Sequence, residues 1–237
     1  MQKNLLIISA ALAALAVGGY ALFAGNQADE ASAPGVTEIN EMTAQNNQSA
    51  SDAEDGDEAS DLPEVVDMTQ GDPDAPVTII EYSSFTCPHC ASFNQGVYDD
   101  LVENYVDTGQ VHWIKREVYF DAYGLWAALV ARCGGSERYH GIVEMLYDNQ
   151  RDWAGSEDGG EVAANLRAIG RRAGMNDDEL NACLSDRDMA TALMEDYRQN
   201  AERHGIRSTP SFVINEELHS NMSYAEFETA IANAGGQ

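Results

Sequence analysis

The sequence predicts an α/β fold whose sheet is interrupted by a block of helices. A strand, a helix and a second strand follow one another between about residues 77 and 115. Strand patterns are then missing from about residue 121 to 206, and one returns at 211–214 before a final helix. Strand, helix and strand in that order are typical of a parallel pair joined by a crossover.

The first predicted strand covers residues 77–82, an almost continuous run of β-branched and aromatic residues that is typical of a buried strand. A helix is predicted after Cys87, because apolar residues recur there mostly three or four positions apart. Those residues are Phe93, Val97, Leu101, Val102 and Tyr105. The second strand is predicted at 111–115.

The predicted helical block begins with the apolar run 125–131, and glycines at 134–135, 159–160 and 174 separate its helices. Acidic residues directly after Asn176 predict a helix start there, since they oppose the positive end of the helix dipole. A capping-box pattern, Ser223 with Glu226, predicts where the last helix begins.

The amino-terminal part is predicted to export the chain. Lys3 precedes twenty uncharged residues, 5–24, which have the composition of a signal peptide and could also just span a bilayer. Residues 1–24 are therefore a signal peptide or a membrane anchor. Both alternatives put the remainder outside the cytoplasm, either secreted into the periplasm or anchored to the inner membrane by residues 5–24.

Residues 25–62 are predicted to be a disordered acidic linker. They contain ten acids and no Lys or Arg, a composition that buries too little apolar surface to fold. The whole chain of 237 residues carries a formal charge of −27 with only 13 basic residues, which argues against a nucleic-acid partner. The folded part is predicted from residue 63 to 237.

The residues expected to carry the chemistry are among four cysteines: Cys87, Cys90, Cys133 and Cys183. The CxxC pair alone is compatible with redox chemistry, zinc binding or haem attachment. Haem attachment needs His after the second cysteine, where this chain has Ala91. A four-cysteine zinc site normally shows two close pairs, but Cys133 and Cys183 are far apart in sequence. No metal is therefore predicted.

The redox interpretation has a physical mechanism. Cys87 would lie at the first turn of a helix, where unpaired N–H groups and the helix dipole favour a thiolate. Cys90 would lie one turn further in and be more buried. A lowered pKa makes Cys87 a good leaving group and stabilises the reduced protein, so that the pair acts as an oxidant. His89 could donate another hydrogen bond to this thiolate, and Pro88 suits a helix start.

Residues 81–90, Glu-Tyr-Ser-Ser-Phe-Thr-Cys-Pro-His-Cys, resemble the active-site segment of the DsbA family of thioredoxin-fold disulfide oxidases. The resemblance runs from about residue 63 to the carboxyl terminus and includes residues 208–213, Ser-Thr-Pro-Ser-Phe-Val. It implies a thioredoxin-like fold with an inserted helical domain. It also implies a cis Thr209–Pro210 bond beside the cysteines, whose backbone binds an extended substrate peptide as an added strand.

The resemblance assigns two further pairs. Glu81 and Lys115 look like the family's buried acid and base, which relay protons and tune the cysteines; the alternative is two solvated strand-end charges, and Arg116 competes as the base. Cys133 and Cys183 look like the second, structural disulfide of some family members; the alternative is two separate buried thiols. The chain departs from the family at 216–218, where Glu-Glu-Leu replaces a turn glycine, so the last strand is expected to be short or irregular.

The function that follows from this resemblance is an exported thiol:disulfide oxidoreductase that introduces disulfides into reduced or unfolded exported proteins through Cys87 and Cys90. A DsbB-like, quinone-linked membrane oxidase would reoxidise the pair, and the chemistry requires no organic cofactor. The alternatives are a disulfide isomerase or reductase on the same scaffold, and a non-catalytic peptide-binding chaperone.

Overall fold

The computed structural model describes residues 62–235. The predicted signal peptide or anchor at 1–24, and residues 25–61 of the predicted acidic linker, lie outside the described residues. Within 62–235, no helix is both long enough and apolar enough to cross a membrane.

The centre of the fold is a five-stranded mixed sheet with the order β1-β3-β2-β4-β5. Its strands are β1 (Met68–Gln70), β2 (Val77–Ser83), β3 (Val111–Glu117), β4 (Ser211–Ile214) and β5 (Glu217–Ser220). The predicted parallel pair is confirmed, because β2 and β3 run parallel with Glu81 opposite Lys115. All other neighbouring strands are antiparallel. The short strand β1 was not predicted.

The helix after Cys87 contains two π-helical segments. It runs through α2 (Pro88–Phe93), η1 (Asn94–Tyr98), α3 (Asp99–Leu101) and η2 (Val102–Val106). Each π segment shifts the following side chains around the helix axis. As a result Tyr98 and Val106 are the buried residues, whereas the predicted Val97 and Tyr105 are only half-buried.

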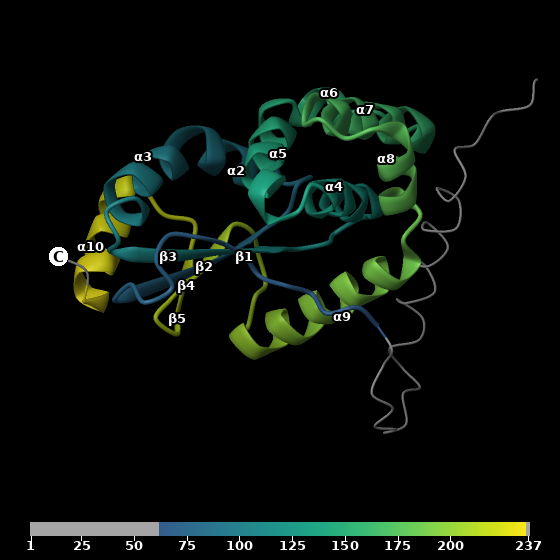
Figure 1. Ribbon diagram of the computed structural model, residues 1–237. Coiled ribbons are helices and arrows are strands. Elements are labelled where there is room, and N and C mark those ends of the chain that lie inside the picture. The colour runs from purple at the N-terminus through teal and green to yellow at the C-terminus, as the bar shows by residue number, and fades with distance from the viewer. Residues whose placement is uncertain (1–61, 236–237) are drawn as a thin grey trace, which may run out of the picture. The chain divides into compact units, whose positions relative to one another are not determined.

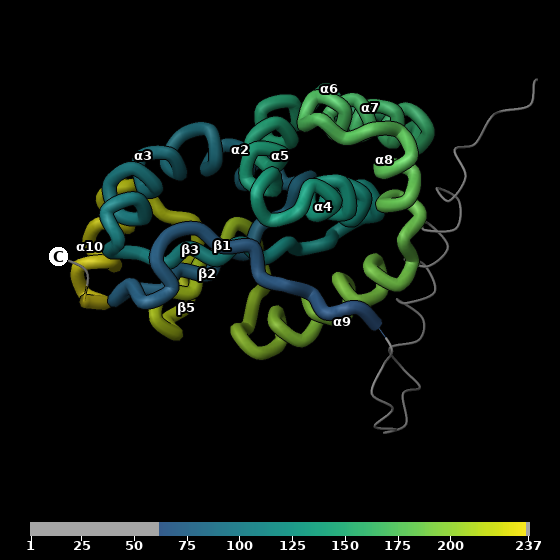
Figure 2. Tube along the Cα trace, in the orientation of Figure 1, coloured from purple at the N-terminus to yellow at the C-terminus, as the bar shows by residue number. Residues whose placement is uncertain are grey.

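The predicted helical insertion is confirmed. Six helices lie between β3 and β4: α4 (Ala122–Cys133), α5 (Ser136–Asp148), α6 (Gln150–Ala154), α7 (Gly159–Arg172), α8 (Asp177–Leu184) and α9 (Arg187–His204). The predicted helix start at Asn176 is a complete capping box with Glu179. Figure 2 shows the chain leaving the sheet into α4 and returning from α9 to the last strands.

Helices cover both faces of the sheet (Figure 1). The helix after Cys87 and α10 (Tyr224–Ala234) pack on one face, around a cluster that includes Phe93, Trp113, Phe212 and Phe227. On the other face, Tyr197 of α9 packs against Tyr82, Val118 and Val213. The insertion has its own core, which also contains Phe85 and Cys90. The active-site segment is therefore held between two hydrophobic cores.

The last hairpin turns without glycine. Ile214 of β4 pairs with Glu217 of β5, so the turn consists of Asn215 and Glu216, with φ of 42° and 76°. Two successive left-handed residues favour Asn or Gly, and Glu at the second position is strained. The Asn215 side chain compensates locally by accepting a hydrogen bond from the Thr78 backbone N–H at 2.8 Å. The expected short last strand is present, with four residues.

Candidate active site

Cys87 and Cys90 lie at the start of α2. Cys87 is the N-cap residue with extended backbone angles, φ −82° and ψ 119°, and Pro88 follows it at the first helical position. Cys87 is half-buried, Cys90 is fully buried, and both sulfurs are unbonded. A backbone hydrogen bond from Cys87 N–H to Ser84 O, 3.1 Å long, closes the turn that leads out of β2.

Thr209 lies beside Cys87. The Thr209–Pro210 bond is cis, and the Cys87 thiol donates to the Thr209 carbonyl oxygen at 3.6 Å. Pro210 directly precedes β4, which pairs with β2, so the neighbouring strands bring this loop to the cysteines. The Thr209 hydroxyl is buried and has no hydrogen-bond partner within residues 62–235.

The surroundings of the two cysteines lower the pKa of Cys87 and raise the pKa of Cys90. Hydrogen bonding from the Cys90 thiol is the main reason why the pKa of Cys87 falls to about 5, and burial opposes the fall. The Thr209 hydroxyl, which is free to turn toward the Cys87 thiolate, and the backbone N–H groups of Cys90 and His89 lower it further. The pKa of Cys90 is raised by its hydrogen bond to Cys87 and by burial, so Cys90 stays a thiol.

The two residues between the cysteines are exposed. Pro88 occupies the helix position that needs no N–H donor. The contribution of His89 to the Cys87 thiolate comes from its backbone N–H.

Glu81 and Lys115 form a buried ion pair. Lys115 Nζ lies 2.8 Å from Glu81 Oε2, and both side chains are at most 1% exposed. Trp113 Nε1 also donates to Glu81 Oε2, at 3.1 Å. The two charges are therefore not solvated strand ends. Arg116 is excluded as the partner base because it pairs with Asp67 at 2.7 Å.

Tyr147 lies near both this ion pair and the cysteines. Lys115 Nζ lies 5.8 Å from the centre of its ring, and its hydroxyl donates to Ser84 O at 3.4 Å. Burial and the nearby Glu81 carboxylate raise the pKa of Tyr147 well above its usual value.

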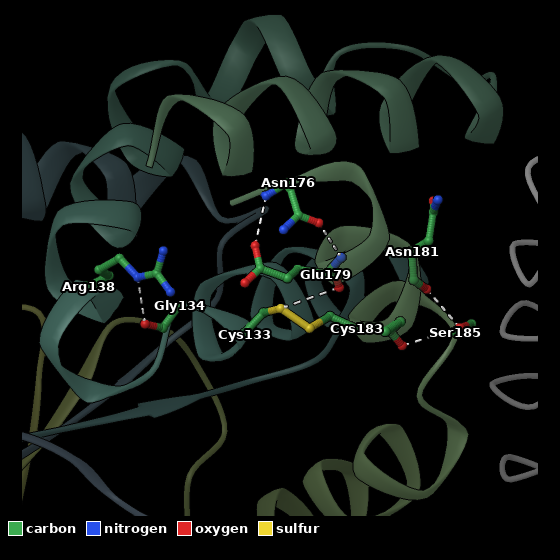
Figure 3. Close-up of a disulfide and its surroundings, with 9 residues drawn as sticks. Cys133, Gly134, Arg138, Asn176, Glu179, Asn181, Cys183 and Ser185 are labelled. Atoms are coloured by element: carbon green, nitrogen blue, oxygen red, sulfur yellow. Dashed lines mark hydrogen bonds between the residues drawn. A yellow bond between two sulfur atoms is a disulfide. The ribbon is translucent and has the colours of Figure 1, made fainter. Parts of the chain in front are cut away.

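Cys133 and Cys183 are joined to each other (Figure 3). Cys133 is the last residue of α4 and Cys183 belongs to α8, with Cα atoms 5.9 Å apart. Their sulfurs are engaged in this bond and are thus not available as metal ligands.

Sequence reasoning missed Gln150, a buried residue at the start of α6. Its Nε2 donates to Phe85 O at 2.8 Å and to Cys87 O at 3.0 Å. A single glutamine in a helical stretch carries no pattern that would have identified it. Tyr147 was missed for the same reason.

A mixed sheet with a CxxC motif at a helix start, facing a cis proline, defines the thioredoxin-fold class, here with a helical insertion. A family profile described as "Thioredoxin" matches residues 64–233. The chain belongs to this thioredoxin family, and the predicted thioredoxin-like fold with inserted helices is confirmed.

Two similar proteins indicate which members of the thioredoxin family the chain resembles. It is 30% identical over 169 residues to a Rickettsia conorii protein whose name assigns it provisionally to the protein-disulfide oxidoreductases. The match covers 71% of this chain and only 60% of that protein. Among solved structures, alpha-DsbA1 of Wolbachia pipientis has a TM-score of 0.67 and 27% identity, covering 73% of this chain and 92% of that one. The predicted resemblance to the DsbA family is confirmed.

Proposed function

We propose that this protein is an exported thiol:disulfide oxidoreductase that introduces disulfides into other exported proteins. The observation that carries the proposal is the environment of Cys87, a half-buried thiol at a helix start with a pKa of about 5, beside the cis Thr209–Pro210 bond. The names of the Rickettsia and Wolbachia relatives support the same chemistry.

The cycle starts from the Cys87–Cys90 disulfide. A substrate thiolate attacks Cys87 Sγ and forms a mixed disulfide with it. The bond between Cys87 and Cys90 breaks, and the released Cys90 sulfur takes up a proton. A second substrate thiolate attacks the substrate sulfur of the mixed disulfide and expels Cys87 as a thiolate. The substrate thus gains one disulfide and loses two electrons, which reduce the Cys87–Cys90 pair.

The surrounding residues have distinct proposed roles. The cis Thr209–Pro210 segment pairs with an extended substrate peptide, and the unpartnered Thr209 hydroxyl is available to the Cys87 thiolate. Pro88 starts the helix, and His89 stabilises the thiolate. Glu81 and Lys115 relay the proton between Cys90 and solvent and tune the cysteines, and the Cys133–Cys183 disulfide stabilises the insertion.

The proposed function also requires export of the chain and reoxidation of the Cys87–Cys90 pair. Residues 1–24 would deliver the chain to the periplasm or hold it at the inner membrane, with 25–62 as a spacer. A DsbB-like, quinone-linked membrane oxidase would return the pair to the disulfide.

The test is the equilibrium of the Cys87–Cys90 pair with glutathione, together with the Cys87 titration followed by thiolate absorbance. We expect a midpoint near pH 5 and a strongly oxidising pair. Because the folded-state pKa is depressed, ionisation of Cys87 stabilises the reduced form fully above the unfolded pKa of about 8.5, and this contribution disappears as the pH falls through 5. An equilibrium like that of cytosolic thioredoxin would contradict the oxidase role and indicate a reductase.

A further inference from the structure

Gln150 connects the helical insertion to the backbone around the nucleophilic cysteine. It is only 8% exposed, and its side-chain amide nitrogen bridges two carbonyl oxygens, Phe85 O at 2.8 Å and Cys87 O at 3.0 Å. The two carbonyls are two residues apart, so one amide group holds both ends of the Phe85–Thr86–Cys87 segment. This segment ends at the reactive sulfur.

The Cys87 carbonyl is the group through which Gln150 can fix the orientation of the Cys87–Pro88 peptide. Because residue 88 is proline, the peptide unit between Cys87 and Pro88 has no N–H, and its carbonyl is its one hydrogen-bonding group. Besides Gln150, this carbonyl accepts a bond of 3.2 Å from Ala91 N–H within the first turn of the helix. The Phe85 carbonyl would lose a short hydrogen bond in a buried setting if Gln150 were absent, which is costly.

Tyr147, three residues before Gln150, contacts the same segment. Its hydroxyl donates to Ser84 O at 3.4 Å. Tyr147 lies near the end of α5 and Gln150 begins α6, so the junction of these helices presents two donors to carbonyls of residues 84–87. The insertion thus touches the active-site segment through directed hydrogen bonds as well as through apolar packing.

We propose that Gln150 is a positioning residue of the redox site, which fixes the Cys87–Pro88 peptide plane and thereby aims Cys87 Sγ at its hydrogen-bond donors. This inference rests on the proposed function of the Cys87–Cys90 pair. The orientation of this peptide plane sets ψ of Cys87, and with it the location of Sγ relative to the Cys90 thiol and the first N–H groups of α2. Those are the groups that stabilise the thiolate.

Two substitutions test the proposal. Gln150→Met keeps the length of the side chain and removes the donor, and Gln150→Glu keeps the shape but replaces the two N–H donors by the single O–H of a buried carboxylic acid. Loss of hydrogen bonds of ordinary strength corresponds to about 0.5–1 pH unit, so we expect the Cys87 midpoint to rise by about that amount in Gln150→Met. Burial opposite two carbonyl oxygens keeps the acid of Gln150→Glu protonated, so this variant retains one donor and its midpoint should rise by less than that of Gln150→Met.

The same shift must appear in the redox equilibrium. A rise of 0.5–1 pH unit in the Cys87 midpoint corresponds to a roughly 3- to 10-fold change in the equilibrium constant with glutathione, toward a less oxidising pair. Gln95→Ala is the matched control, because Gln95 Nε2 donates to Tyr147 O at 3.0 Å, also between the active-site helix and α5, without touching residues 84–87. This control should leave both quantities at their wild-type values.

A measurement on the unaltered protein removes any dependence on how the variants fold. In a spectrum of the full chain labelled with 15N, the Gln150 side-chain amide should exchange slowly with solvent and shift as Cys87 ionises. Fast exchange without a shift would overturn the proposal, as would folded Gln150→Met and Gln150→Glu variants with unchanged midpoint and equilibrium constant. Failure of the proposed function looks different, because the wild-type protein itself would then lack the low midpoint and the oxidising equilibrium.

Discussion

Glu81 and Lys115 illustrate how single residues in this fold depend on their neighbours. Both are fully buried, and the pair has an excellent geometry at 2.8 Å. Removing one partner leaves an isolated charge inside the protein, whereas replacing both removes the two buried charges together. The Glu81 Oε1 atom is buried and accepts no hydrogen bond within residues 62–235, which makes the carboxylate especially dependent on Lys115.

At this scale we predict that Lys115→Met lowers the free energy of unfolding by about 3–5 kcal/mol, because the Glu81 charge then lacks its partner. Urea denaturation of the reduced protein measures this. The double variant Glu81→Gln with Lys115→Met should recover a large part of the loss. Arg198→Ala, which breaks an exposed pair with Glu195, is the control and should cost about 0.5 kcal/mol or less. A cost for Lys115→Met no greater than this control would show that the pair is energetically unimportant.

Among the elements, the helix after Cys87 shows where sequence patterns succeed and where they fail. Apolar spacing predicted its existence and its buried Phe93 and Leu101. The other predicted residues, Val97, Val102 and Tyr105, are half-buried and pack against the same core. The spacing did not predict the two π segments, in which Tyr98 and Val106 are the buried residues. Strand β1 was missed because three residues with one buried side chain carry no periodicity.

In the β4–β5 turn, Glu216 has a left-handed backbone conformation that favours glycine. Glu216→Gly should raise the free energy of unfolding by about 1 kcal/mol, since glycine adopts φ of 76° without steric cost. Thermal or urea unfolding measures the gain. Glu217→Gly, at the first position of β5, should instead destabilise, because glycine loses more conformational entropy than Glu in an extended strand. Equal effects of the two substitutions would mean that backbone strain at Glu216 is not the cause.

Across the whole molecule, the redox site is assembled from parts that are distant in sequence. The motif residues Cys87 and Cys90 were identifiable because their spacing is itself the signal. The neighbour Thr209 and the ion pair were accessible only through resemblance to a family. Gln150 was invisible to both approaches, since its role depends on where a helix of the insertion ends and on two backbone carbonyls.

The Cys133–Cys183 disulfide links two helices of the insertion and should stabilise the whole molecule. It closes a segment with a sequence separation of 50, for which chain entropy gives about 4 kcal/mol of stabilisation. The double variant Cys133→Ala and Cys183→Ala should therefore lose about 2–4 kcal/mol in urea unfolding. The equilibrium of Cys87–Cys90 with glutathione should stay the same, because the second pair contacts other residues (Figure 3). A changed equilibrium with unchanged stability would reverse the assigned role from structural to redox.

The contact between Cys87 and Thr209 joins residues 122 positions apart, with the whole insertion between them. During synthesis, a chain that emerges amino terminus first presents both motif cysteines long before Thr209 or Gln150 exists outside the ribosome. Until those two residues have been made and have docked, Cys87 lacks two contacts of its folded environment, although Cys90 and His89 are already present. The complete environment of Cys87 therefore forms only after the whole insertion has been synthesised, so the reactive cysteine emerges early and its site is finished late.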